Sequence, residues 1–163
     1  MALAVLLTLV VLAWVFLQMP PGIGQTFAER MKIVARADLF VIIWLTAAIA
    51  NVARLRFFSS DDIAGSSRST GSQSVRDAGA ILQNTLEQTV LAISVHFALA
   101  AEVHTLTPTA AGALAGLFSL GRLLFWIGYR HGAARRAFGF ALTFYPNVGV
   151  LLFVVFSRAL ASF

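Results

Sequence analysis

Stretches without a single charged residue alternate along this chain with short clusters of charge. Residues 1–19 form the first uncharged stretch and residues 137–157 the last. Each has about the 20 residues that an α-helix needs to cross the hydrocarbon core of a bilayer. Only 12% of the 163 residues are charged, against about 25% in a soluble domain. The chain is therefore predicted to be an all-α integral membrane protein in contact with the lipid bilayer.

The alternation predicts five transmembrane helices. Residues 1–19 lack the basic start and the small-residue cleavage site of a signal peptide, so we expect them to remain as an N-terminal transmembrane helix. Residues 20–37 form a linker that either lies at the membrane interface or extends the next helix. The main bundle is expected within residues 38–163, with spans at about 37–56, 75–103, 108–130 and 137–157.

Three features qualify these spans. The segment 59–74 is rich in Ser and Gly and is expected to be an aqueous loop. Gly112 and Gly116 have the small-residue spacing that lets helix backbones approach closely. Pro146 falls in the middle of the last span, where a proline should bend the helix.

The composition excludes several kinds of site. The chain has no cysteine, so it forms no disulfide and offers no thiolate nucleophile. His96, His104 and His131 do not have metal-ligand spacing, and we assign them to packing or interfacial roles without a metal. The net charge of +5 comes from basic residues at helix ends, which anchor helices to anionic headgroups and do not indicate a nucleic-acid partner.

Five spans place the basic residues unequally on the two sides of the membrane. The richer side is expected to be cytoplasmic, together with the N-terminus, because cytoplasmic loops carry an excess of Lys and Arg. The richer side holds Arg54, Arg56, Arg68, Arg76, Arg130, Arg135 and Arg136, and the other side holds Arg30, Lys32, Arg36 and Arg158.

Two charged residues fall inside predicted spans, where charges are expensive and usually face a bundle interior or a polar site. Glu87 lies in the third span and Arg122 in the fourth. Asn84 and Gln88 share a helix face with Glu87, because offsets of three and four bring side chains together. Two interpretations stay open: Glu87 and Arg122 form a buried ion pair that fixes helix register, or they line a polar site for an anionic ligand. In either case we expect Glu87 to pair with an arginine, Arg122 of the same chain or of a neighbouring copy.

Two segments resemble a known family. The run Ala80-Ile-Leu-Gln-Asn-Thr-Leu-Glu-Gln-Thr89 is similar to the second-helix signature of the MAPEG superfamily, the membrane-associated proteins of eicosanoid and glutathione metabolism. The run Gly121-Arg-Leu-Leu-Phe-Trp-Ile-Gly-Tyr-Arg130, followed by Arg135-Arg-Ala-Phe-Gly139, resembles the segment from the third to the fourth helix of that family. The likeness covers about residues 38–160 and is typical of the bacterial branch of the family.

The resemblance implies a four-helix bundle in each subunit of a homotrimer, with residues 1–19 as an additional helix. It implies that glutathione binds between subunits near the cytoplasmic face of a bacterial inner membrane. The ligand-binding positions of the family fall on Asn84, Glu87, Arg122 and Tyr129, and loosely on Arg54 and Arg56, while the arginine that activates the glutathione thiol falls on Arg136.

The sequence departs from the family at three further positions. Ala80 stands where the well-studied transferases have an arginine, and Arg76, one turn further out, is the candidate replacement. Gln88 and Phe125 each stand where those enzymes have a tyrosine.

Two functions follow as hypotheses. The first is a glutathione-dependent transferase or peroxidase acting on lipophilic electrophiles that enter from the bilayer. The alternative is a non-catalytic membrane subunit or scaffold that binds a partner protein or lipid, with the N-terminal helix as the docking surface for a protein.

Overall fold

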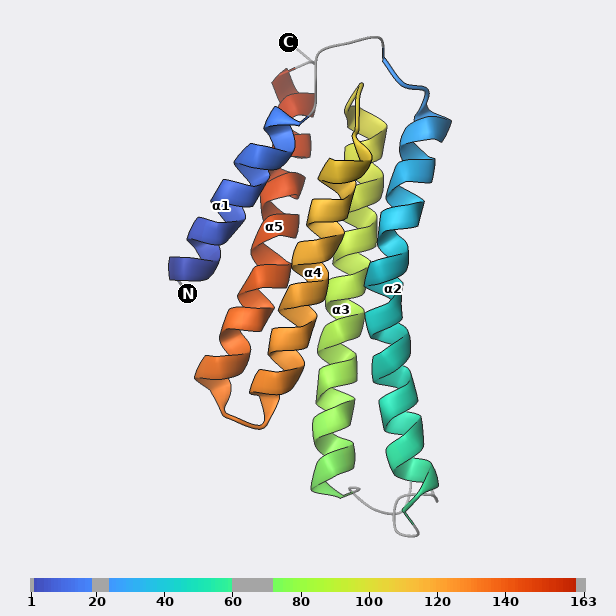
Figure 1. The fold of residues 1–163 in the computed structure, drawn as a ribbon, viewed down its shortest axis with the longest axis vertical. Coiled ribbons are helices and arrows are strands. Elements are labelled where there is room, and N and C mark those ends of the chain that lie inside the picture. The colour runs from blue at the N-terminus through green and yellow to red at the C-terminus, as the bar shows by residue number, and fades with distance from the viewer. Residues whose placement is uncertain (1, 19–23, 60–71, 161–163) are drawn as a thin grey trace.

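The computed structural model describes residues 2–18, 24–59 and 72–160, and over these residues the chain consists of five α-helices without a strand (Figure 1). The predicted all-α membrane fold is confirmed. By length and composition, α2, α4 and α5 are able to cross a membrane. The more polar α3 has 30 residues, and the apolar α1 has 16. The helices are α1 (Ala2–Leu17), α2 (Phe27–Phe57), α3 (Gln73–Glu102), α4 (Pro108–Tyr129) and α5 (Ala133–Leu160).

The helix α2 begins inside the segment that was predicted to be a linker. Thr26 and Glu29 form a capping box, in which the Thr26 hydroxyl accepts from the Glu29 backbone and the Glu29 carboxylate accepts from the Thr26 backbone. From Phe27 onward the segment is therefore a continuous helix, and it extends the next span. Asp38, expected at the end of that span, instead lies buried within α2.

The helices α2 to α5 run alternately up and down, and α1 lies on the outer side of α5 (Figure 1). The end of α2, the start of α3 and the turn between α4 and α5 lie at one end of the bundle, which we call the basic end. Within the described residues it carries Arg54, Arg56, Arg76, Arg130, Arg135 and Arg136. The predicted grouping of these arginines is thus confirmed, whereas the cytoplasmic orientation of this end stays a prediction. Arg68 and most of the expected loop 59–74 lie outside the described residues.

A close helix contact joins α4 to α5 through glycines. A Cβ added at Gly121 would lie 2.9 Å from the Gly139 carbonyl oxygen, and one added at Gly139 would lie 2.6 Å from the Gly121 carbonyl oxygen. A side chain at either position would therefore push the two helices apart. Gly112 and Gly116 have open space around them, so their spacing does not mark a helix contact within the chain.

The opposite end of the bundle is closed by Gln25 and Arg30. The Gln25 side chain donates to the Leu106 carbonyl at 3.2 Å and accepts from the Leu106 backbone N–H at 2.8 Å. The Arg30 Nε donates to the Ala100 carbonyl at 2.6 Å, and its Nη1 donates to the Gln25 carbonyl. These bonds tie the start of α2 to the end of α3 and to the loop before α4.

A buried polar pair joins α2 to α3 below this closure. The Nδ1 of His96 lies 2.6 Å from the Oδ1 of Asp38, and both side chains are about 5% exposed. His96 therefore has the packing role predicted for it, with a carboxylate partner that the sequence did not suggest.

Candidate functional site

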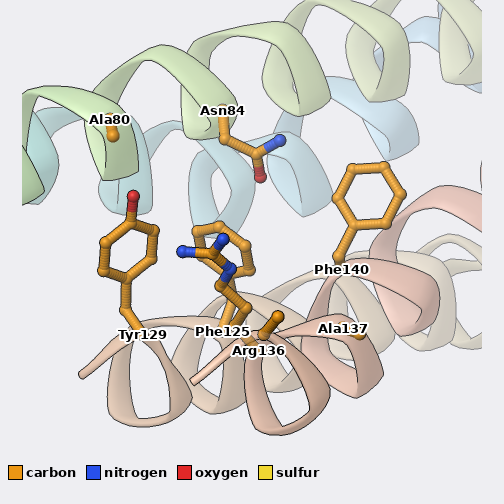
Figure 2. Close-up of a pocket in the computed structure, with 8 residues that line it drawn as sticks. Ala80, Asn84, Phe125, Tyr129, Arg136, Ala137 and Phe140 are labelled. Carbon is orange, nitrogen blue, oxygen red and sulfur yellow. The ribbon is translucent and has the colours of Figure 1, made fainter. Parts of the chain in front are cut away.

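A pocket of about 350 Å³ opens between α3, α4 and α5 toward the basic end (Figure 2). Each of the three helices contributes one polar side chain and at least one apolar residue to the lining. The lining residues are Ala80 and Asn84 from α3, Phe125 and Tyr129 from α4, and Ala133, Arg136, Ala137 and Phe140 from α5.

Three polar side chains reach this pocket, one from each helix. The Arg136 guanidinium lies over the Tyr129 ring, 4.8 Å from its centroid, in the geometry of a cation–π contact. Asn84 faces them from α3 (Figure 2). The structure thus brings together Asn84, Tyr129 and Arg136, which the sequence named as site residues.

Arg122 is close to the pocket but does not line it. Its side chain is fully buried; Nη1 donates to the Asn84 Oδ1 at 2.8 Å and Nη2 donates to the Thr143 Oγ1 at 2.6 Å. The guanidinium carbon lies 4.7 Å from the Phe125 ring centroid and 5.8 Å from that of Phe118. Arg122 therefore stands behind Asn84 and Phe125, where it supports the wall of the pocket.

The prediction of an ion pair between Glu87 and Arg122 is wrong within the chain. Glu87 is exposed and its carboxylate accepts from the Gln83 amide at 3.0 Å. An α-helix turns about 100° per residue, so Glu87 and Gln88 point in clearly different directions, and only Gln88 is buried. The face of α3 toward α4 and α5 carries Asn84, whose neutral amide oxygen takes the place of the expected carboxylate.

Arg54 and Arg76 belong to the basic end but do not line the pocket. The Arg54 Nη2 donates to Asn51 Oδ1 at 3.2 Å, and the Arg76 Nη2 donates to Gln73 Oε1 at 2.7 Å. Both side chains are exposed. Arg76 therefore does not fill the space beside Ala80 in this structure.

The sequence did not reveal Thr143 behind the pocket or the lining residues Phe140, Ala133 and Ala137. The Thr143 hydroxyl donates to the Phe140 carbonyl at 2.8 Å and accepts from Arg122. Phe140 forms the apolar wall opposite Tyr129 (Figure 2). The one available signal in the sequence was Gly139, a small residue that lies one turn before Thr143 in α5.

Comparison with known proteins identifies the family to which this bundle corresponds. A family model described as "MAPEG family" matches residues 31–156, which include α3, α4 and most of α2 and α5. No curated protein and no solved structure matches the chain. The α1 helix lies before the matched region.

Proposed function

Because the chain belongs to the MAPEG family of integral membrane proteins, we propose that it is a glutathione-dependent transferase or peroxidase acting on lipophilic electrophiles. One observation carries the proposal: Asn84, Tyr129 and Arg136, each from a different helix, line a single pocket at the basic end. That pocket is the proposed glutathione site.

Arg136 is the proposed catalytic residue. A free thiol has a pKa of about 8.5 and a nearby cation favours its thiolate form, which is the nucleophile. The Tyr129 ring lies against the Arg136 guanidinium and restricts its orientation. Asn84 supplies a polar contact from the facing helix.

The remaining lining supports an apolar second substrate. Phe125 and Phe140 present aromatic rings, and Ala133 and Ala137 leave space between them. A lipophilic electrophile entering from the bilayer would lie against these rings while glutathione occupies the polar side.

The homotrimer is part of the same proposal. An exposed stripe on α3 repeats at alternating intervals of four and three residues, the spacing of a helix–helix seam. It carries the polar side chains of Gln83, Glu87 and Ser94 next to Val90 and Phe97. Polar groups inside a span are normally covered by protein, so a neighbouring copy is the proposed cover. Native mass spectrometry in mild detergent should give the mass of three chains, and a stable monomer would contradict the assembly.

The alternative function is a non-catalytic membrane subunit that binds a partner protein or lipid. Two observations favour it: Arg136 is the only guanidinium among the residues that line the described pocket, and α1 lies outside the family match. The apolar face of α1 would then be the docking surface for the partner.

The enzyme is tested with Arg136→Ala and its neighbour Arg135→Ala. Arg135 is exposed and does not line the pocket, so it is a matched control for loss of one basic side chain. Arg136→Ala should lower the rate of glutathione conjugation to chlorodinitrobenzene by about 100-fold or more, the scale of losing one preorganised charge contact. Arg135→Ala should change that rate less than about threefold, since exposed charges contribute little.

Two further measurements complete the test. Arg136→Lys should restore part of the rate, because an ammonium keeps the charge and loses the planar fork. Glutathione added to the wild-type protein at neutral pH should produce the ultraviolet absorbance of a thiolate. If calorimetry detects no binding and no thiolate signal forms at millimolar glutathione, the chain is not a glutathione enzyme.

A further inference from the structure

We propose that Arg122 is a positioning residue that holds the oxygen of the Asn84 amide and leaves its N–H donors for a ligand, and that the pocket therefore selects ligands by an anionic group. The inference deepens the proposed function and rests on it for the use of this pocket. The anionic group could belong to glutathione or to another amphiphilic anion, and the shared chemistry is what the pocket recognises.

The orientation of the Asn84 amide follows from the chemistry of its partner. A guanidinium carries only donors, so the Asn84 atom that lies 2.8 Å from the Arg122 Nη1 must be the oxygen. The amide Nδ2, with its two N–H donors, then points away from Arg122. Figure 2 shows this nitrogen on the side of the amide toward Phe140, a residue that lines the pocket.

Arg122 is itself held from two further directions. The Thr143 hydroxyl donates a hydrogen bond to the Phe140 carbonyl and accepts one from the Arg122 Nη2. The Phe125 ring covers the guanidinium face at 4.7 Å. Because the guanidinium cannot turn freely, the amide that it holds has one preferred orientation.

The charged residue that lines the pocket and the charged residue behind its wall are both arginines, Arg136 and Arg122. No carboxylate of the described residues lies within 4.0 Å of Arg122 or of Arg136. No acidic residue lines the described pocket, and the Arg122 Nε has no hydrogen-bond partner there. An anion in the pocket would accept from Asn84 and Arg136 and would also offset the buried charge of Arg122 behind the wall.

Asn84→Asp separates the role of the amide from the stability of the bundle. One carboxylate oxygen can still accept from Arg122, while the other replaces the donor Nδ2 with a negative charge. The variant should keep a melting temperature at least as high as the wild type, whereas Asn84→Ala should lower it. Both should lose anion binding.

Arg122→Lys tests the positioning residue itself, with Arg30→Lys as its control. Lysine keeps the charge but cannot hold Asn84 and Thr143 with a planar fork. Arg30 is also buried, but it lies at the opposite end and contacts only backbone carbonyls. Arg122→Lys should raise the KM for glutathione by about tenfold, the size of one lost charge-assisted bond, with a smaller change in kcat. Arg30→Lys should leave both within about twofold.

Two probes identify what the pocket selects. Anilinonaphthalene sulfonate carries an anion on an aromatic system, and phenylnaphthylamine is its neutral counterpart. Thermal unfolding followed by circular dichroism should show stabilisation of the wild type by the sulfonate and much less by the neutral probe. In Asn84→Asp the sulfonate should lose at least about tenfold in affinity, because the lost donor and the added charge both oppose an anion.

The outcomes distinguish this inference from the proposed function. Sulfonate binding that depends on Asn84, together with no binding of glutathione, would support anion selection and overturn the glutathione enzyme. Glutathione turnover that is unchanged in both Asn84→Asp and Arg122→Lys would overturn the inference and leave the enzyme standing. Equal stabilisation by the two probes would also overturn it.

Discussion

Two buried arginines stand at opposite ends of this bundle, and their surroundings differ. Arg30 is 8% exposed and donates to backbone carbonyls of a helix end and a linker. Arg122 is fully buried, is held by the side chains of Asn84 and Thr143, and lies behind the wall of a pocket. Backbone carbonyls fix the path of the chain, whereas side-chain partners can be oriented and exchanged. We infer that Arg30 stabilises the fold by joining backbone segments, and that Arg122 positions side chains at the pocket.

The largest expected effect lies on the Arg30 side, at the buried pair of Asp38 and His96. Asp38→Ala would leave the His96 ring without its partner in the interior. Breaking a buried pair of this kind costs about 3–5 kcal/mol if it is ionised. Thermal unfolding should therefore occur at a much lower temperature, while glutathione affinity at temperatures where the variant is folded should match that of the wild type.

A second variant tests whether the pair is the cause. Replacing both partners by apolar residues, as in Asp38→Leu with His96→Leu, removes the uncompensated polar group and should recover most of the lost stability. If the double variant is only as stable as the sum of the two single changes, Asp38 and His96 are not coupled. If either single change weakens ligand binding in the folded protein, the two ends are not independent.

A smaller effect is expected at the contact of α4 with α5, on the Arg122 side. A Cβ at Gly139 would meet the Gly121 carbonyl oxygen at 2.6 Å. Because backbone cannot give way as a flexible side chain can, Gly139→Ala should cost at least the about 1–3 kcal/mol typical of overpacking. It should also weaken ligand binding, because the Arg122 contact to Thr143 spans the same two helices.

Gly116→Ala is the matched control on α4. The space around Gly116 is open, and alanine favours a helix over glycine, so this change should leave both stability and binding nearly unchanged. A large loss of stability in Gly116→Ala would show that this face of α4 packs against another copy of the chain. Comparable binding by Gly139→Ala and the wild type would separate the pocket from the helix contact.

The same contrast explains which parts of the molecule the sequence could predict. Long uncharged stretches have one physical solution in a membrane, because every backbone group must be paired within a helix. The five helices and the grouping of arginines at one end therefore followed from the pattern. Asn84, Tyr129 and Arg136 followed from the family resemblance, which placed them on facing helices.

The partners of individual side chains did not follow, because they depend on rotations that the pattern leaves free. Glu87 was expected to face Arg122, but the burial of Gln88 turns Glu87 outward. Asp38 was expected at a helix end, but the capping box at Thr26 starts α2 earlier and places Asp38 inside the bundle. A difference of about three turns at a helix start, or of about 100° around a helix axis, is enough to exchange a surface charge for a buried one.

The substitution Arg30→Lys is expected to have a small effect, and it is the sharpest test of the comparison. Lysine keeps the positive charge and can reach one of the two carbonyls that Arg30 contacts, those of Ala100 and Gln25. The loss of one hydrogen bond from a charged group costs about 1.5–3 kcal/mol at most, and the flexible lysine stem should recover part of it. We expect a melting temperature a few degrees below that of the wild type, with glutathione affinity and the conjugation rate within about twofold. The same substitution at Arg122 should have the opposite balance of effects: a modest loss of stability and a large loss of glutathione affinity. If Arg30→Lys weakens binding as much as Arg122→Lys does, both arginines act only through the general stability of the bundle. Arg122 then has no separate role in positioning the pocket.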